Sequence, residues 1–190
     1  MQSILPYTIT INEPFAEEKL LNGTYIVIVH ASRIPPHIGI IADQAYHSLS
    51  IKGQELNVPV AAFIRNTTLR KIPCLFINIK SHPAYDAAQL KEHFISSIQQ
   101  FPKVAAGSAT CLSPVKLFFE EVYRVKMKDV HSIFELLPVL EAEGLIGETS
   151  ALFIATGRFQ LPTYSMEEIN KGIAQAENEA KAITKATTKN

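Results

Sequence analysis

One cysteine and one histidine are the residues of this chain best suited to carry out chemistry together. Cys111 follows the small, polar residues 107–110 and precedes an amphipathic segment, so it stands where a helix is expected to begin. Unpaired backbone N–H groups and the helix dipole favour an anion at that end, which should lower the pKa of a thiol and make it a nucleophile. The same amides could stabilise a developing oxyanion.

His37 is the candidate general base. It opens a predicted strand directly after Pro35-Pro36, so its ring would lie at a strand end, held firmly and still within reach. Gly39 would lie on the same face and leave room beside the ring. A third polar group usually orients such a base, and His47, which follows in the next predicted strand, is the candidate for that role.

The turn between the two histidines decides whether their side chains can meet. A two-residue turn would place His37 and His47 on opposite faces of the hairpin, because side chains alternate along a strand. Ser48 and Ser50 would then share the face of His37. A three-residue turn over residues 42–44 would place both histidines on one face. The segment lacks the Asn-Gly or Asp-Gly pair typical of two-residue turns, which favours the three-residue form.

Other residues able to carry chemistry are weaker candidates. Cys74 lies in the apolar segment CLFINI and is expected in the core. Arg33, in the loop before His37, could meet an anionic group of a substrate, although a solvated side chain is the commoner state of a loop arginine. No histidine pair has the spacing of an H-E-x-x-H zinc site, and no Gly-rich phosphate-binding loop occurs, so we predict no metal and no cofactor.

Composition and charge narrow the class of protein. The 190 residues suit one domain, and 47% of them are hydrophobic, which is enough for a sizeable core. Eighteen basic and eighteen acidic residues give a formal net charge of zero without long runs of one sign, which argues against nucleic acid or an anionic membrane as partner. The sequence shows no secretory signal and no apolar stretch of membrane-spanning length. With only two cysteines, we expect a cytoplasmic protein with free thiols.

Hydrophobic periodicity divides the chain into a strand-rich first half and a helical second half. Short apolar, β-branched runs predict strands at 9–11, 24–31, 37–41, 45–51, 58–64, 74–80 and, late in the chain, 151–155. A helical turn is expected at 17–21, and longer helices are expected to begin near Asp86, Cys111 and Ser132. This pattern predicts one α+β domain over residues 1–162, with a mainly antiparallel sheet of about five strands packed against helices.

Residues 163–190 predict a C-terminal amphipathic helix with a frayed tail. Ser165 and Glu168 have the spacing of a capping box. The apolar residues that follow recur at three-four spacing: Met166, Ile169, Ile173, Ala176, Ala180 and Ile183. This seam could join two copies of the chain through residues 166–183 or pack back on the domain, and its short length favours packing back.

The order of these features resembles the circularly permuted papain-like fold. Its members include the lecithin:retinol acyltransferase group and the YiiX-type hydrolases, which are related to the NlpC cell-wall peptidases. HIGIIADQAYHSLSI, residues 37–51, is similar to the family's paired-histidine hairpin. CLSPVKLFFEEVY, residues 111–123, is similar to its cysteine helix. The resemblance covers about residues 24–125.

This resemblance implies a role for each residue of the candidate site. Cys111 would be the nucleophile, His37 the base that takes the thiol proton, and His47 the residue that orients the imidazole. It implies a cysteine hydrolase or acyl-transfer enzyme acting on an amide or thioester bond of a small-molecule or peptide-like substrate. The alternative is a catalytically inactive interaction domain on the same scaffold.

Overall fold

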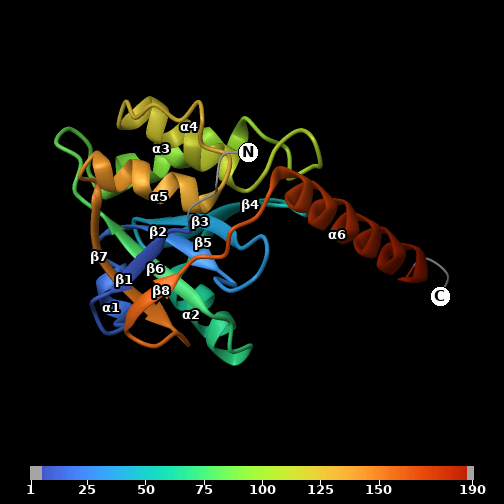
Figure 1. Ribbon diagram of the computed structural model, residues 1–190, viewed down its shortest axis with the longest axis horizontal. Helices are drawn as coiled ribbons and strands as arrows, with labels where there is room; N and C mark the ends of the chain where they lie inside the picture. Colours follow the sequence, from blue (N-terminus) through green and yellow to red (C-terminus); the bar gives the residue numbers. More distant parts are fainter. Residues whose placement is uncertain (1–5, 188–190) are drawn as a thin grey trace.

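A six-stranded antiparallel sheet forms the centre of the computed structural model, which describes the backbone of residues 6–187 and the side chains of residues 6–178 (Figure 1). The strand order is β5-β4-β3-β2-β6-β7, and β1 and β8 form a separate pair. The strands are β1 (Thr8–Ile11), β2 (Thr24–Val29), β3 (His37–Ala42), β4 (Ala45–Ser50), β5 (Gly53–Pro59), β6 (Cys74–Ile79), β7 (Ile146–Leu152) and β8 (Gly157–Gln160).

Helices cover both faces of this sheet. In Figure 1, α3, α4 and α5 lie on one side of the sheet and α1 and α2 on the other. The helices are α1 (Glu17–Leu20), α2 (Val60–Leu69), α3 (Ala87–Gln99), α4 (Leu112–Val122), α5 (Ile133–Ala142) and α6 (Met166–Thr187). The predicted α+β class with an antiparallel sheet and a C-terminal helix is confirmed, with six strands in the sheet rather than five. No helix in the described part of the chain has the length and apolar character needed to cross a membrane.

Alternating side chains of the central strands build two cores. Ile28 of β2 and Ile38 of β3 pack in the core under α3, α4 and α5, which we call the upper core. Val29 of β2 and Ile41 of β3 pack in the core against α1 and α2, which we call the lower core. Because both faces of these strands are buried, their sequences read as continuous apolar runs, and the register decides which core each residue enters.

The β3–β4 turn has two residues, which corrects the favoured three-residue form. Ala42 pairs with Ala45, and the intervening Asp43 and Gln44 have φ angles of 45° and 64°. Two consecutive left-handed residues are what a tight hairpin turn requires. A tertiary contact also supports the turn, because Lys91 of α3 forms an ion pair with Asp43. His37 and His47 therefore lie on opposite faces of the hairpin.

The strand predicted over residues 58–64 is wrong. Strand β5 ends at Pro59, and α2 begins at Val60. Val60, Phe63, Ile64 and Thr67 are buried, and their spacing of three and four residues is the period of a helix rather than of a strand. The segment is apolar, as predicted, but it is helical.

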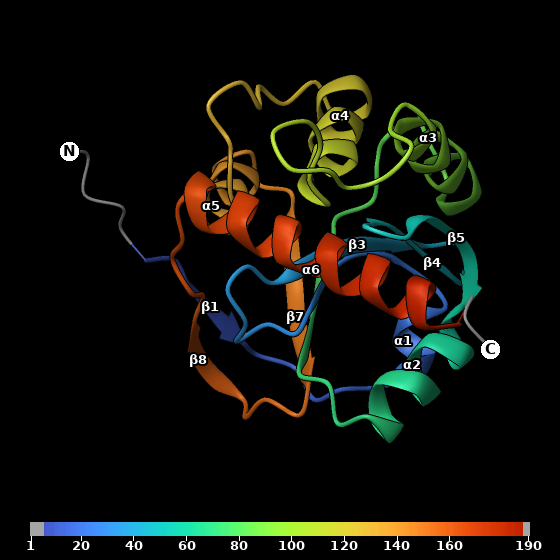
Figure 2. The same cartoon turned by 90° about the vertical axis from the view of Figure 1, so that its right-hand side faces the viewer.

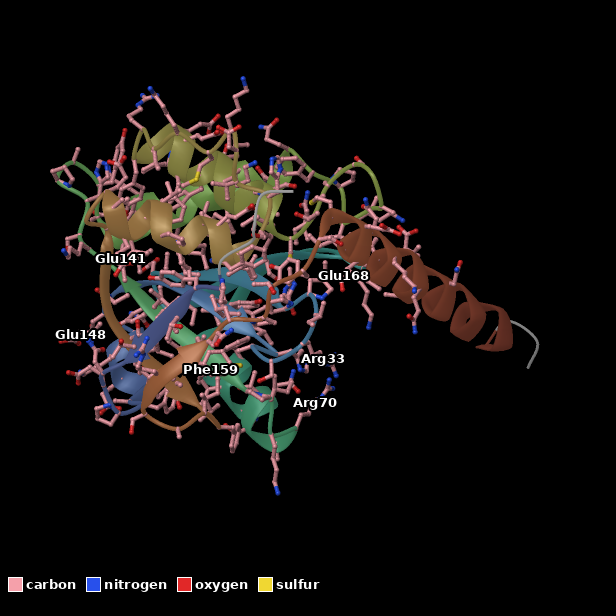
Figure 3. The ribbon with its side chains drawn as sticks, viewed as in Figure 1. Arg33, Arg70, Glu141, Glu148, Phe159 and Glu168 are labelled. Carbon is pink, nitrogen blue, oxygen red and sulfur yellow. The ribbon has the colours of Figure 1, made fainter. Side chains whose placement is uncertain are left out.

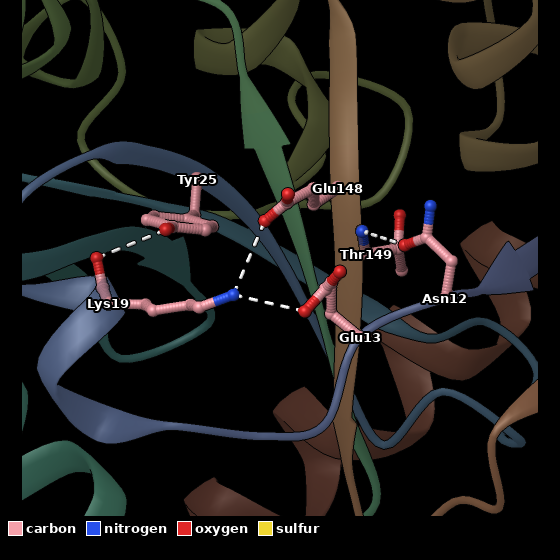
Figure 4. A network of polar contacts seen from close by, with 6 residues as sticks. All are labelled: Asn12, Glu13, Lys19, Tyr25, Glu148 and Thr149. Carbon is pink, nitrogen blue, oxygen red and sulfur yellow. Dashed lines mark hydrogen bonds and ion pairs between the residues drawn. The ribbon is translucent and has the colours of Figure 1, made fainter.

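The two-stranded sheet is fixed to the large one through the segment after β1. The N–H groups of Asn12 and Glu13 both donate to the Thr149 carbonyl of β7 at 3.1 Å, and the Thr149 N–H donates to Asn12 Oδ1 at 2.9 Å. Lys19 Nζ lies 3.1 Å from the Glu13 carboxylate and 3.4 Å from that of Glu148 (Figure 4). These ion pairs are exposed and contribute little to stability. The backbone hydrogen bonds are therefore the main link between the two sheets.

Gly39 leaves no open space beside the ring of His37, contrary to expectation. A Cβ atom at this position would lie 2.6 Å from the Tyr46 ring and 2.6 Å from the His47 carbonyl oxygen. Tyr46 is fully packed in the lower core and covers the glycine. The missing side chain therefore admits an aromatic ring of the neighbouring strand.

We expect Gly39→Ala to destabilise the fold by about 1–3 kcal/mol, because the added methyl group meets backbone and a packed ring that cannot move away. Urea denaturation measures the change. Gly172→Ala in α6 is the matched control, since its added Cβ would lie 3.4 Å from Pro35 Cδ, an acceptable contact. Equal unfolding midpoints for the two variants and the parent would contradict the packing described here.

Candidate functional site

Cys111 is the N-cap residue of α4 and packs against the upper core. The backbone amides of Ile38, Cys111 and Leu112 act on its sulfur and lower the pKa of the thiol, as expected at a helix N-terminus. Desolvation by burial is the larger effect and raises that pKa, so the net pKa lies above the usual value. The predicted lowering of the thiol pKa is therefore not what this environment produces.

The thiol lies in a small apolar pocket. Its volume is about 60 Å³, and its walls come from the Pro35-Pro36 loop, the starts of α4 and α5, and α6. Tyr164, Ile169 and Ile173 supply much of the apolar wall. Small-molecule sites usually begin at roughly 300 Å³. In this conformation the pocket is far smaller than a usual small-molecule site.

The start of α6 covers this pocket. Ile169 and Ile173 are 6% and 7% exposed, and both belong to the upper core. The Gly107 N–H donates to Asn170 Oδ1 at 3.0 Å, which joins α6 to the loop before Cys111. Figure 2 shows α6 beginning beside α5, and in Figure 1 the rest of the helix projects from the domain.

The predicted apolar seam of α6 is divided by this arrangement. Its early isoleucines pack back on the domain, whereas Met166 is 43% exposed. Ala180 and Ile183 lie outside the residues whose side chains are described. Pairing of two copies through residues 166–183 stays a prediction.

His37 faces away from the thiol. It pairs with Val29, which belongs to the lower core, whereas the next residue, Ile38, belongs to the upper core together with Cys111. Burial and His30, but not Cys111, are the influences that shift the pKa of the His37 ring. Burial, reinforced by the nearby His30, lowers the pKa of His37 to about 4. The imidazole is therefore neutral near pH 7 and lies on the opposite face of β3 from the sulfur.

His47 holds the backbone of the neighbouring strand. It is fully buried in β4, and its Nδ1 accepts a hydrogen bond of 3.1 Å from the Asn57 N–H at an irregularity of the β4–β5 pairing. Asn57 has a φ of 55°, which turns this amide toward the ring. Burial is the main cause that lowers the pKa of His47 to about 4, and Lys91 adds to it. The structure thus gives His47 a partner in β5 and does not place it beside His37.

A basic pocket on the lower side of the sheet was missed by sequence reasoning, apart from Arg33. It measures about 310 Å³ and is lined by His30, Arg33, Arg70 and Lys71 together with three uncharged residues. Residues 58–64 were predicted as a strand, whereas α2 ends at Leu69 and leaves Arg70 and Lys71 in the loop that lines the pocket. The helical spacing from Val60 onward was the signal that could have found this site.

Metal ligands do not gather anywhere in the described part of the chain. No group of three or more His, Cys, Asp or Glu side chains among these residues could hold a metal ion.

Comparison with known proteins adds no relative: no family model, no curated protein and no solved structure matches this chain. The permuted papain-like arrangement stays a prediction.

Undocking of α6 should expose the thiol. We expect Ile173→Asp to weaken docking by about 2 kcal/mol, because a charge replaces a buried apolar side chain, and to speed alkylation of Cys111 by roughly tenfold or more. Mass spectrometry after iodoacetamide treatment gives the rate, with the fully buried Cys74 as internal reference. The matched control is Ala174→Asp at an exposed position. An unchanged Cys111 rate in both variants would contradict the covering role of α6.

The buried His47 should make the fold sensitive to acid. Because the pKa of His47 is about 4 in the folded state and about 6.5 when unfolded, the unfolded chain takes up the proton first as the pH falls. The stabilisation is complete above pH 6.5 and is lost as the pH falls toward 4, by up to about 3 kcal/mol for His47.

Urea denaturation at pH 7 and pH 5 tests this dependence. His47→Leu should lose less free energy of unfolding between these two pH values than the parent does, even if it is less stable at both. The exposed His131 provides the control, and His131→Gln should behave as the parent does. An equal loss in His47→Leu and in the parent would show that His47 is not buried in its neutral form.

Proposed function

We propose that this chain is a binding domain in which Cys111 and His37 do not work as a catalytic pair. One observation supports the proposal most: the side chain of His37 leaves β3 toward α1 and α2, whereas Cys111 packs on the other face of that strand. A general base must reach the proton it removes, directly or through one water. The placement of the two side chains on opposite faces of β3 argues against that transfer.

The electrostatics of both groups support the same proposal. A catalytic thiolate needs a lowered thiol pKa, and a neighbouring imidazolium usually supplies that lowering. Here burial raises the pKa of Cys111 and lowers the pKa of His37 to about 4. Each group is kept neutral near pH 7, the opposite of a thiolate–imidazolium pair. Cys111 then serves as a small apolar residue packed against the upper core, as free cysteine often does.

A thiol hydrolase or acyl-transfer enzyme is the second candidate, and one observation favours it. The amides of Ile38, Cys111 and Leu112 act on the sulfur together, and such donors could stabilise an oxyanion formed on an attacked amide or thioester carbonyl. This candidate requires that α6 leave the pocket and that a group other than His37, in its described position, accept the thiol proton. It therefore ranks below the binding domain.

The pH dependence of thiol alkylation separates the two candidates. For the binding domain, Cys111 should react slowly at pH 7, with a rate that rises only above about pH 9, the ordinary range of an unactivated thiol or higher. His37→Ala should leave this profile unchanged within about twofold, since the ring does not touch the sulfur. Cys74, whose pKa burial raises to about 12, is the internal reference.

Two results would favour the enzyme instead. One is an inflection for Cys111 below about pH 8, which marks an activated thiol. The other is a loss of roughly tenfold or more in the neutral-pH rate on His37→Ala, with no such loss in His93→Ala, a histidine outside the pocket that holds Cys111.

A further inference from the structure

Two loops on the lower side of the sheet enclose the basic pocket. One follows β2 and carries His30, Ser32 and Arg33, and the other joins α2 to β6 and carries Arg70 and Lys71. Figure 3 shows the Arg33 and Arg70 side chains at the same edge of the molecule, beside α2. Residues separated by nearly forty positions in the sequence thus line one cavity of about 310 Å³.

The backbone of both loops is fixed without any ligand. The Ala31 N–H donates to the Pro73 carbonyl at 3.1 Å, which joins one loop to the other. The Arg33 N–H donates to the His30 carbonyl at 2.8 Å and closes a turn. The Lys71 N–H donates to the Thr68 carbonyl at 3.1 Å and closes the end of α2. The walls of the pocket are therefore formed in advance, which lowers the cost of binding.

The cations of this pocket have no anionic partner in the described part of the chain. Arg33, Arg70 and Lys71 are all exposed, and none of them belongs to the ion pairs formed there. Arg70 and Lys71 stand at the C-terminal end of α2, where the helix dipole stabilises positive charge. Arg33 comes from a different loop and has no such stabilisation. A chain with no net charge thus collects three like charges around one cavity.

We propose that this pocket binds the phosphoryl group of a small molecule, held by Arg33, Arg70 and Lys71. Guanidinium groups match the tetrahedral oxyanion by paired hydrogen bonds, and the lysine adds a point charge. The volume exceeds that of inorganic phosphate and lies at the lower end of small-molecule sites, so an organic phosphate monoester fits best. This inference deepens the proposed binding function by naming the class of ligand, and it does not depend on the state of Cys111.

His30 gives the site a second, independent readout. Burial and the charge of Arg33 lower the pKa of His30. A bound dianion would act in the opposite direction and raise that pKa. Ligand binding should therefore move the titration of the His30 ring upward, which NMR detects at that single residue.

Isothermal titration calorimetry of the full chain tests the proposal at constant ionic strength. The probes are phenyl phosphate and inorganic phosphate, with phenyl sulfonate as the singly charged comparison. We expect saturable binding of phenyl phosphate, weakened roughly tenfold or more by Arg33→Gln and by Arg70→Gln, since each removes a charge-assisted pair of hydrogen bonds. The matched control is Arg65→Gln on α2, an exposed arginine outside the pocket lining, which should bind as the parent does.

Each outcome decides one question. Tighter binding of phenyl phosphate than of inorganic phosphate supports an organic monoester, and equal binding supports the phosphate ion itself. Absence of saturable binding up to about 10 mM, or equal weakening by Arg65→Gln and Arg33→Gln, overturns the site. Unchanged thermal unfolding of the variants keeps loss of folding apart from loss of binding. If the pocket does not bind phosphate, the pH profile of Cys111 alkylation is unaffected. The phosphoryl site and the non-catalytic role of Cys111 can therefore be rejected independently.

Discussion

The burial of both faces of β2 and β3 is the constraint on which this structure depends. A strand with water on one side can shift its register at the cost of exposing apolar residues, but a strand covered on both sides must satisfy two cores at once. Ile38 enters the upper core and Ile41 the lower core. This packing also decides the position of His37. Because Ile38 faces the upper core, the preceding residue His37 lies on the opposite face of β3. The chemistry available to the histidine is thus decided by the packing of its apolar neighbours.

The same burial governs the charge state of the candidate site. A helix N-terminus does favour a thiolate at Cys111, but its effect is typically a fraction of a kcal/mol to about 2 kcal/mol, and the cost of desolvating a charge exceeds it here. Where cations stay exposed, at Arg33 and Arg70, no such cost arises, and charge gathers in a preformed pocket. The exposed cations therefore lie at the edge of the sheet, whereas Cys111 lies partly buried against the upper core.

Local patterns in the sequence predicted much of the fold. The helix cap at Asp86, the start of α5 at Ser132 and the apolar strands β2 and β6 all follow from interactions within a few residues. The form of the β3–β4 turn could not be predicted from such local interactions. Asp43 and Gln44 adopt left-handed conformations with support from Lys91, which is far away in the sequence. The candidate site depended on that turn and on the face of β3 that α4 covers, which no local pattern specifies.

The central claim, that the His37 ring and the Cys111 sulfur lie on opposite faces of β3, is tested most directly by NMR titration of His37 in the parent and in Cys111→Ser. The account predicts a His37 pKa near 4 in both proteins, since the ring responds to its buried surroundings and to His30 rather than to the thiol. A His37 pKa near or above that of a free imidazole, or one that moves by about a unit or more when the sulfur is replaced, would contradict it.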